Sequence, residues 1–282
     1  MVNLGHWWIW PPGMTVDSRG AEMKKTLSVV LALVSSAFVA AQSPANLKLA
    51  PGTSIPVTFS HGIDAKRVHN GDVVSAKTTQ PIQIVGRKLL PAGAEVVGHV
   101  VSADGFTYDK TPYVEQKLGT LTIRFDTLRA KDVDIPLTVY VRALADPLSV
   151  QDAELPNVYD DSLRTRRQIG GDQVTPSQNE VLSQDGDTVG YLKRGGVYAH
   201  LIAANGNSPE GCDGTDSEQA MGLFSASACG LYGFTDIKLV ETGRKDGSST
   251  LSLVSRRHSP QIWKNSVALL EVVTPTQAVA SR

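Results

Sequence analysis

The sequence has few cysteines, no long apolar run and no excess of basic charge, and each shortage excludes a class of protein. Its two cysteines, Cys212 and Cys229, form no C-x-x-C pair of the kind that marks common zinc and redox sites. The 27 basic residues against 28 acidic ones give no basic face for nucleic acid. The longest apolar run, Thr26 to Ala41, is shorter than the roughly 20 residues that a membrane-spanning helix needs.

Catalytic motifs are also missing. The sequence has no G-x-S-x-G elbow and no S-x-x-K, and the KTT at residues 77–79 is not a K-T-G. His200 lies in the apolar run GVYAHLIA and is interpreted as a strand residue, while His258 follows two arginines on an expected exposed turn. Because no activated nucleophile or acid–base pair can be named, we predict no catalytic residue and no cofactor.

Two polar stretches contain side chains that bind metals elsewhere. HGIDAKRVHNGD offers His61, His69 and Asp72, and CDGTDSE offers an acidic cluster at residues 213, 216 and 218. Neither stretch has the histidine spacing of a zinc site or the alternating oxygen ligands of an EF-hand loop. We therefore predict no metal site and interpret both stretches as polar loops.

A secretory signal peptide is predicted at Met23–Ala41, where two lysines precede the apolar run and small residues precede Gln42. Such signals begin a chain, so residues 1–22, with three of the four tryptophans, are interpreted as a wrongly assigned start; a long natural n-region is the alternative. Cleavage would leave a mature chain that starts at Gln42, with no stable membrane span. The expected location is the periplasm or the exterior.

Strand patterns dominate from residue 50 onward. In LTIRFD, residues 121, 123 and 125 alternate with polar neighbours, and Leu137, Val139 and Val141 alternate with Thr138, Tyr140 and Arg142, as in half-buried strands whose polar face meets solvent. Further runs are IPVTF, DVVSAKT, AEVVGHVVS, GVYAHLIA, STLSLVS and SVALLEVV. We predict an all-β fold, a barrel or sandwich of many short, mainly antiparallel strands with at most one or two short helices.

One helix is predicted at residues 216–229, since Asp216 and Gln219 form a capping-box pattern and Gly230 could end it. The chain is divided into a β unit at 42–146, a polar linker or loop excursion at 147–180, a Gly-rich β unit at 181–273 and a tail at 274–282. Export favours a disulfide between Cys212 and Cys229, which would hold the 216–229 segment against the C-terminal sheet; a catalytic or metal-binding cysteine is the alternative.

The turns between residues 50 and 103 carry a family resemblance. Gly52-Thr53, Ile55-Pro56, Gly71-Asp72, Pro91-Ala92-Gly93 and Gly98 resemble the opening of the C-terminal β-barrel domain of TrbI-like proteins, the scaffold subunits of conjugation and type IV secretion channels. Members of that family carry an inner-membrane helix and a Pro-rich periplasmic stretch, which this sequence does not show. The resemblance therefore implies a β-barrel and a secretion or conjugation accessory.

A partner-binding segment is predicted within the polar stretch from Asp146 to Glu180. Tyr159 would supply apolar area and Arg164, Arg166 and Arg167 would supply charged contacts. A solvated spacer is the alternative. The predicted function is an exported, non-enzymatic β-domain protein that binds or organises an envelope protein or glycan, with an exported hydrolase acting on peptidoglycan or polysaccharide as the alternative.

Overall fold

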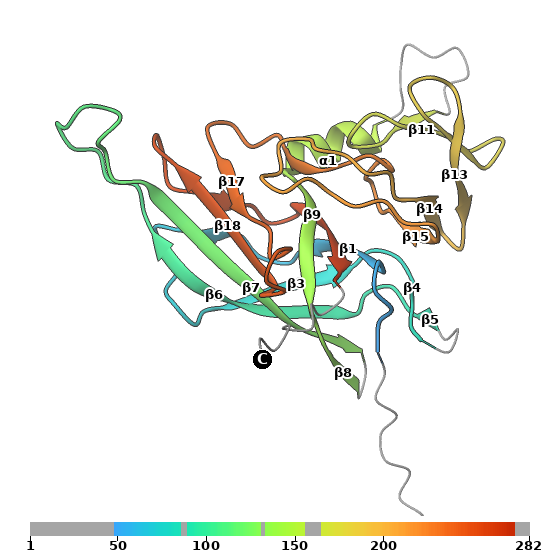
Figure 1. The fold of residues 1–282 in the computed structure, drawn as a ribbon, viewed down its shortest axis with the longest axis horizontal. Helices are drawn as coiled ribbons and strands as arrows, with labels where there is room; N and C mark the ends of the chain where they lie inside the picture. The colour runs from blue at the N-terminus through green and yellow to red at the C-terminus, as the bar shows by residue number, and fades with distance from the viewer. Residues whose placement is uncertain (1–47, 86–88, 131–132, 156–164, 274–282) are drawn as a thin grey trace, which may run out of the picture. The chain divides into compact units, whose positions relative to one another are not determined.

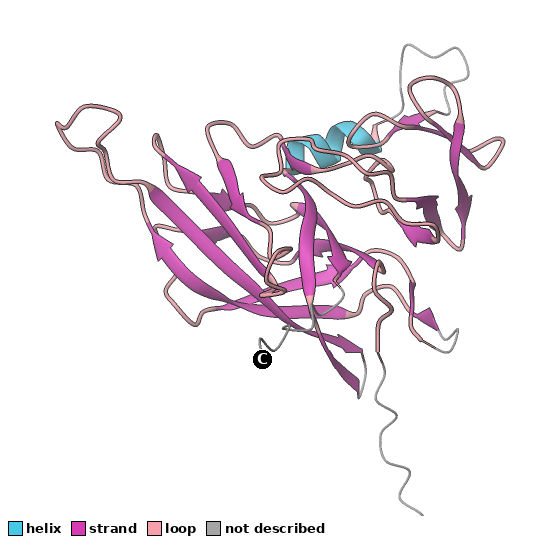
Figure 2. Ribbon diagram, viewed as in Figure 1, coloured by secondary structure: helices cyan, strands magenta, loops and turns pink. Residues whose placement is uncertain are grey.

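The computed structural model describes residues 48–85, 89–130, 133–155 and 165–273, which belong to one compact unit that begins at Ala45. The upstream segment 1–22, the predicted signal peptide, Gln42 and the tail at 274–282 lie outside the described residues. Apart from loops and one helix, the described residues form β-strands, so the all-β prediction is confirmed (Figure 2). No helix in these described ranges is long and apolar enough to cross a membrane.

A ten-stranded sheet curls into a nearly closed barrel (Figure 1). Its spatial order is β16 (Gly230–Tyr232), β9 (Val139–Ala145), β20 (Val267–Val272), β1 (Ser54–Phe59), β3 (Val73–Thr78), β6 (Glu95–Asp104), β7 (Gly119–Ala130), β18 (Thr250–Ser255) and β17 (Lys238–Glu241), with β8 (Val133–Pro136) paired to β7. Among the described strand pairs, only β16 and β9 run parallel.

The opening of the barrel is bridged where β9 approaches the β17–β18 hairpin. The Val141 N–H donates to the Thr242 carbonyl at 2.9 Å, and the Val139 N–H donates to Ser249 Oγ at 3.0 Å. These bonds pair the amides of Val139 and Val141, which would lack partners at the edge of an open sheet.

A second, six-stranded antiparallel sheet stands beside the barrel (Figure 1). It contains β10 (Arg166–Arg167), β11 (Gln173–Thr175), β12 (Glu180–Leu182), β13 (Thr188–Lys193), β14 (Gly196–His200) and β15 (Glu218–Ala220). Two small ribbons pair β2 (Ile63–Asp64) with β19 (Gln261–Ile262) and β4 (Ile82–Gln83) with β5 (Leu89–Leu90).

Two apolar cores share the strands β9 and β20. The barrel interior is filled by alternate residues of its strands, including Ile123, Phe125 and Leu270, which are all buried. The second core lies between the outer face of β9 and β20 and the six-stranded sheet, and it includes Leu269 and Phe224. Both faces of β9 and β20 are therefore covered, which explains their nearly continuous apolar sequence.

The predicted alternation is confirmed in β7, where Leu121, Ile123 and Phe125 face the core while their neighbours are more exposed. In β9 the prediction that Tyr140 and Arg142 face solvent is wrong, since both are at most 1% exposed. The pattern gives the face of each residue correctly, but the second face of this strand is covered by chain between β14 and β16.

The predicted helix at 216–229 is wrong. This segment contains β15 and a series of turns, in which Gly222 takes a φ of +58° that a helix cannot accommodate. The single helix, α1 (Pro147–Glu154), lies at the start of the stretch interpreted as a linker. Asp146 caps it by accepting from the Ser149 N–H at 2.8 Å, and Pro147 occupies its first turn.

The sheets do not follow the division of the chain at 147–180. The barrel takes strands from both sides of this stretch, because β1 pairs with β20 and β7 pairs with β18. Within the stretch itself, α1, the segment between β10 and β11, and β11 contribute the buried residues Ala153, Ile169 and Val174 to the second core.

Candidate functional site

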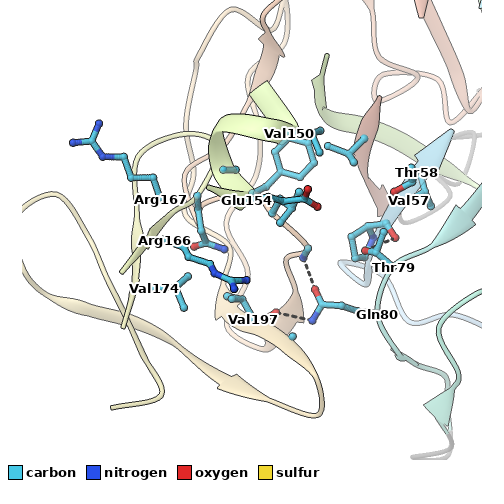
Figure 3. A pocket seen from close by; sticks show the side chains of 18 of the residues that line it. Val57, Thr58, Thr79, Gln80, Val150, Glu154, Arg166, Arg167, Val174 and Val197 are labelled. Atoms are coloured by element: carbon cyan, nitrogen blue, oxygen red, sulfur yellow. Dashed lines mark hydrogen bonds between the residues drawn. The ribbon is translucent and has the colours of Figure 1, made fainter. Parts of the chain in front are cut away.

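A cleft of about 780 Å³ lies where α1, β10 and the six-stranded sheet meet the outer face of β1 and β20 (Figure 3). Its walls are mainly apolar and include Pro56, Val57, Val150, Val174, Leu192, Val197, Leu223, Phe224 and Val267. A cleft of this size with a few polar groups among apolar walls is typical of ligand-binding sites.

Gln80 forms a fixed polar wall of the cleft and joins the barrel to the second sheet. Its Nε2 donates to the Val197 carbonyl at 3.0 Å, and its Oε1 accepts from the Gly222 N–H (Figure 3). The amide also needs a glycine at position 196, because a Cβ there would lie 1.9 Å from Gln80 Nε2. With both amide atoms bonded inside the protein, Gln80 has little capacity left for a ligand.

Gln168 is different, because neither of its amide atoms has a hydrogen-bond partner among the described residues. The residue follows β10, lines the cleft and is 6% exposed. Its backbone N–H is used in the turn to Asp172. Buried amides nearly always form hydrogen bonds in folded proteins, so the absence of such bonds at Gln168 Nε2 and Oε1 requires an explanation.

Three charged side chains also line the cleft. Arg166 and Arg167 form β10, and Glu154 ends α1; all three are exposed, and none makes an ion pair within the described ranges. Figure 3 shows the Arg166 guanidinium near Val174 and Val197, Arg167 directed away from them, and Glu154 directed toward the strand of Val57. The cleft therefore has a cationic rim on the β10 side and one carboxylate on the α1 side.

The disulfide between Cys212 and Cys229 is confirmed, with Cα atoms 5.9 Å apart. It packs against Tyr140 on the outer face of β9. The disulfide thus joins the loop before β15, which contains Cys212, to the turn before β16, which contains Cys229, on the covered second face of β9.

Arg142, fully buried in β9, holds the chain on both sides of this disulfide. Its guanidinium donates to the carbonyls of Asp213, Ile202, Ala226 and Ala228, and its Nη1 lies 3.2 Å from Glu271 Oε2. Most of its donors are therefore satisfied by backbone of the covering segment, which explains how a charged residue can be buried in a strand.

Glu271 is the carboxylate partner of this arginine, and it also accepts from the Tyr140 O–H at 2.6 Å. Burial raises the pKa of Glu271, while the bonds from Tyr140 and Arg142 act in the opposite direction. Burial also raises the pKa of Tyr140, with the nearby Glu271 charge adding to the shift. A pocket of about 420 Å³ borders the pair. The hydrogen bonds of this cluster connect β9, β20 and the loop that contains Cys212, which indicates a structural role.

The structure places the sequence-predicted residues as follows. Arg166 and Arg167 meet at the cleft, whereas Tyr159 and Arg164 lie outside the described residues. His61, His69 and Asp72 are exposed, Asp213 pairs with Arg244, and Glu218 pairs with Lys193; no cluster of three metal ligands occurs in the described ranges. His200 and His258 are both exposed.

Sequence reasoning missed Gln168, Gln80 and Glu154. The Asp146-Pro147 pair was a signal for α1, and hence for Glu154, but nothing local marks the two glutamines, whose roles depend on chain packed from far away. No protein-family model and no curated protein matches the chain.

Proposed function

We propose that this protein is an exported, non-enzymatic module that binds a component of the cell envelope in the cleft between α1, β10 and the β1–β20 face. The observation that carries the proposal is a largely apolar cleft with charged groups and a buried amide that find no partner among the described residues. Such groups gain hydrogen bonds and ion pairs only from a bound molecule.

Export is supported by two independent features. The Met23–Ala41 stretch has the composition of a signal peptide that is cleaved before Gln42, and the Cys212–Cys229 bond fits an extracellular or periplasmic location. The resemblance of residues 50–103 to TrbI-like proteins favours a secretion or conjugation apparatus as the source of the bound component.

Site-specific photo-crosslinking in cells tests the proposal. A benzophenone amino acid replaces Leu223 in the cleft wall or, as a control, Val73, which is 75% exposed on β3. We expect an adduct with an envelope component at position 223, lost when Arg166→Glu is added, and none at position 73. Folded protein that gives no cleft-specific adduct would contradict the proposal.

The hydrolase alternative is tested with the same purified protein. Incubation with peptidoglycan and polysaccharide should give no turnover if the protein only binds. Sustained release of products, abolished by one Ser, Asp or His substitution, would replace the binding proposal with the enzymatic one.

A further inference from the structure

The two unpaired amide atoms of Gln168 indicate which chemical group of a ligand can bind beside them in the cleft. Its Nε2 must find an acceptor and its Oε1 a donor, both in a place that is nearly closed to bulk water. An extended residue of a peptide offers such a donor and acceptor in its own N–H and C=O, which point to the same side of the chain. Phosphate and carboxylate groups offer acceptors only, and a hydrocarbon chain offers neither.

The walls of the cleft disfavour a glycan. A sugar hydroxyl can both donate and accept, but most hydroxyls of a bound sugar would lie against side chains such as Val150, Leu192 and Phe224, which cannot bond them. An apolar side chain of a peptide instead gains from burial against these walls.

The charges set the polarity of the ligand. Arg166 directs its guanidinium toward the cleft wall, whereas Arg167, the next residue of β10, points away from it (Figure 3); Arg166 makes no ion pair within the described ranges, and a guanidinium fork binds a carboxylate in a bidentate manner. Glu154 on the α1 side repels a second acidic group there. A ligand that complements the cleft therefore has its carboxylate on the β10 side and its apolar side chain on the floor.

We infer that the cleft binds an extended peptide segment with an apolar side chain next to a carboxylate, and that Gln168 pairs with its backbone. This inference rests on the proposed function and names the class of partner, a protein in preference to a glycan or a lipid. Gln168 recognises the main chain, while Arg166 selects the acid.

Three pools of fluorescein-labelled, amide-capped hexapeptides test the inference by fluorescence anisotropy with the full-length mature protein. The first pool has Val, Leu or Phe followed by Asp at the centre, the second has Asn in place of Asp, and the third carries an N-methyl group on the backbone nitrogen of the apolar residue. We expect the Asn pool to bind about tenfold more weakly, and the N-methyl pool about threefold to tenfold more weakly, than the first.

Variants assign these effects to residues. Arg166→Gln should remove the difference between the Asp and Asn pools, and Gln168→Leu should remove the difference made by N-methylation. The matched controls are Arg67→Gln, at an exposed ion pair, and Gln116→Leu, whose amide is bonded within its own loop. Both controls lie outside the cleft lining and should leave all three affinities unchanged.

The outcomes separate this inference from the proposed function. Equal binding of the Asp and Asn pools, or no binding of any pool, overturns the peptide assignment. If a cleft adduct still forms at position 223 in cells and proves to be a glycan or lipid, the proposed function stands and this inference fails. Absence of both peptide binding and cleft adducts overturns both.

Discussion

Replacing Gln168 with leucine should stabilise the protein, although the substitution is made at a buried position. The side chain is 6% exposed, both of its amide atoms lack partners, and leucine has a similar volume. Burying an unpaired amide costs about 1–3 kcal/mol in proteins, and the change of shape costs less than about 1.5 kcal/mol. We therefore expect a net gain of about 1–2 kcal/mol in the free energy of unfolding.

For a unit of this size, that gain raises the melting temperature by about 2–8 °C. Thermal unfolding followed by circular dichroism measures the shift, and urea unfolding checks that it appears as a higher midpoint at an unchanged m-value. The assay needs no ligand, so it tests the state of Gln168 apart from any partner.

Gln80→Leu is the matched control, because the same substitution is made at a glutamine that is 3% exposed and fully bonded. Removing this amide leaves the Gly222 N–H without its acceptor, while the Val197 carbonyl keeps the bond from the Met221 N–H, so the substitution should destabilise the protein by about 1–3 kcal/mol. If Gln168→Leu and Gln80→Leu destabilise to a similar extent, the amide of Gln168 is satisfied in solution and the reasoning fails.

Three further predictions concern the covered face of β9 and its surroundings. Arg142→Met should destabilise by about 3–5 kcal/mol in urea unfolding, because Glu271 is left buried without its cation; a loss below about 1 kcal/mol would contradict a tight buried pair. Replacing both Cys212 and Cys229 with alanine should cost about 2–4 kcal/mol, and reduction of that variant should have no further effect. Burial raises the pKa of Asp172 above its ordinary 3.8, so the stability it contributes is present below that pH and is lost as pH rises through its folded pKa. Asp172→Asn should therefore gain stability relative to wild type above about pH 4, and parallel pH curves for the two proteins would refute this.

The sequence was sufficient for the class of the fold because alternation reports which residues share a face. In β7 the apolar set of Leu121, Ile123 and Phe125 is the set that enters the barrel. Alternation does not report what covers the other face. Arg142 and Tyr140 read as solvent-facing because the segment that buries them, around Cys212 and Cys229, is distant in sequence.

Helix placement failed for a related reason. The capping pattern at Asp216 is real as a local signal, but Gly222 and the disulfide impose turns that tertiary contacts stabilise. Of the candidate site, the sequence predicted Arg166 and Arg167, as charged residues that contact a partner. Gln168 was not, since an amide becomes informative only when the fold leaves it buried and unpaired.

Because the 147–180 stretch is part of the fold, deleting residues from it should affect stability. As a spacer, residues 150–170 could be deleted with little loss of stability. In the structure this span contains most of α1, all of β10 and buried Ile169, so its deletion should expose the second core and lower the melting temperature.

β20, the last described strand, lies between β9 and β1 and connects them in the barrel sheet. Until that strand has emerged and docked, β1 and β9 each present a free edge, and the pairing of Ser54 with Glu271 must close a loop that spans nearly the whole described chain. Native structure therefore forms late and from the complete chain, at the slow rate expected of distant pairings. A protein truncated just after β18 should form an aggregation-prone intermediate and not a smaller stable protein.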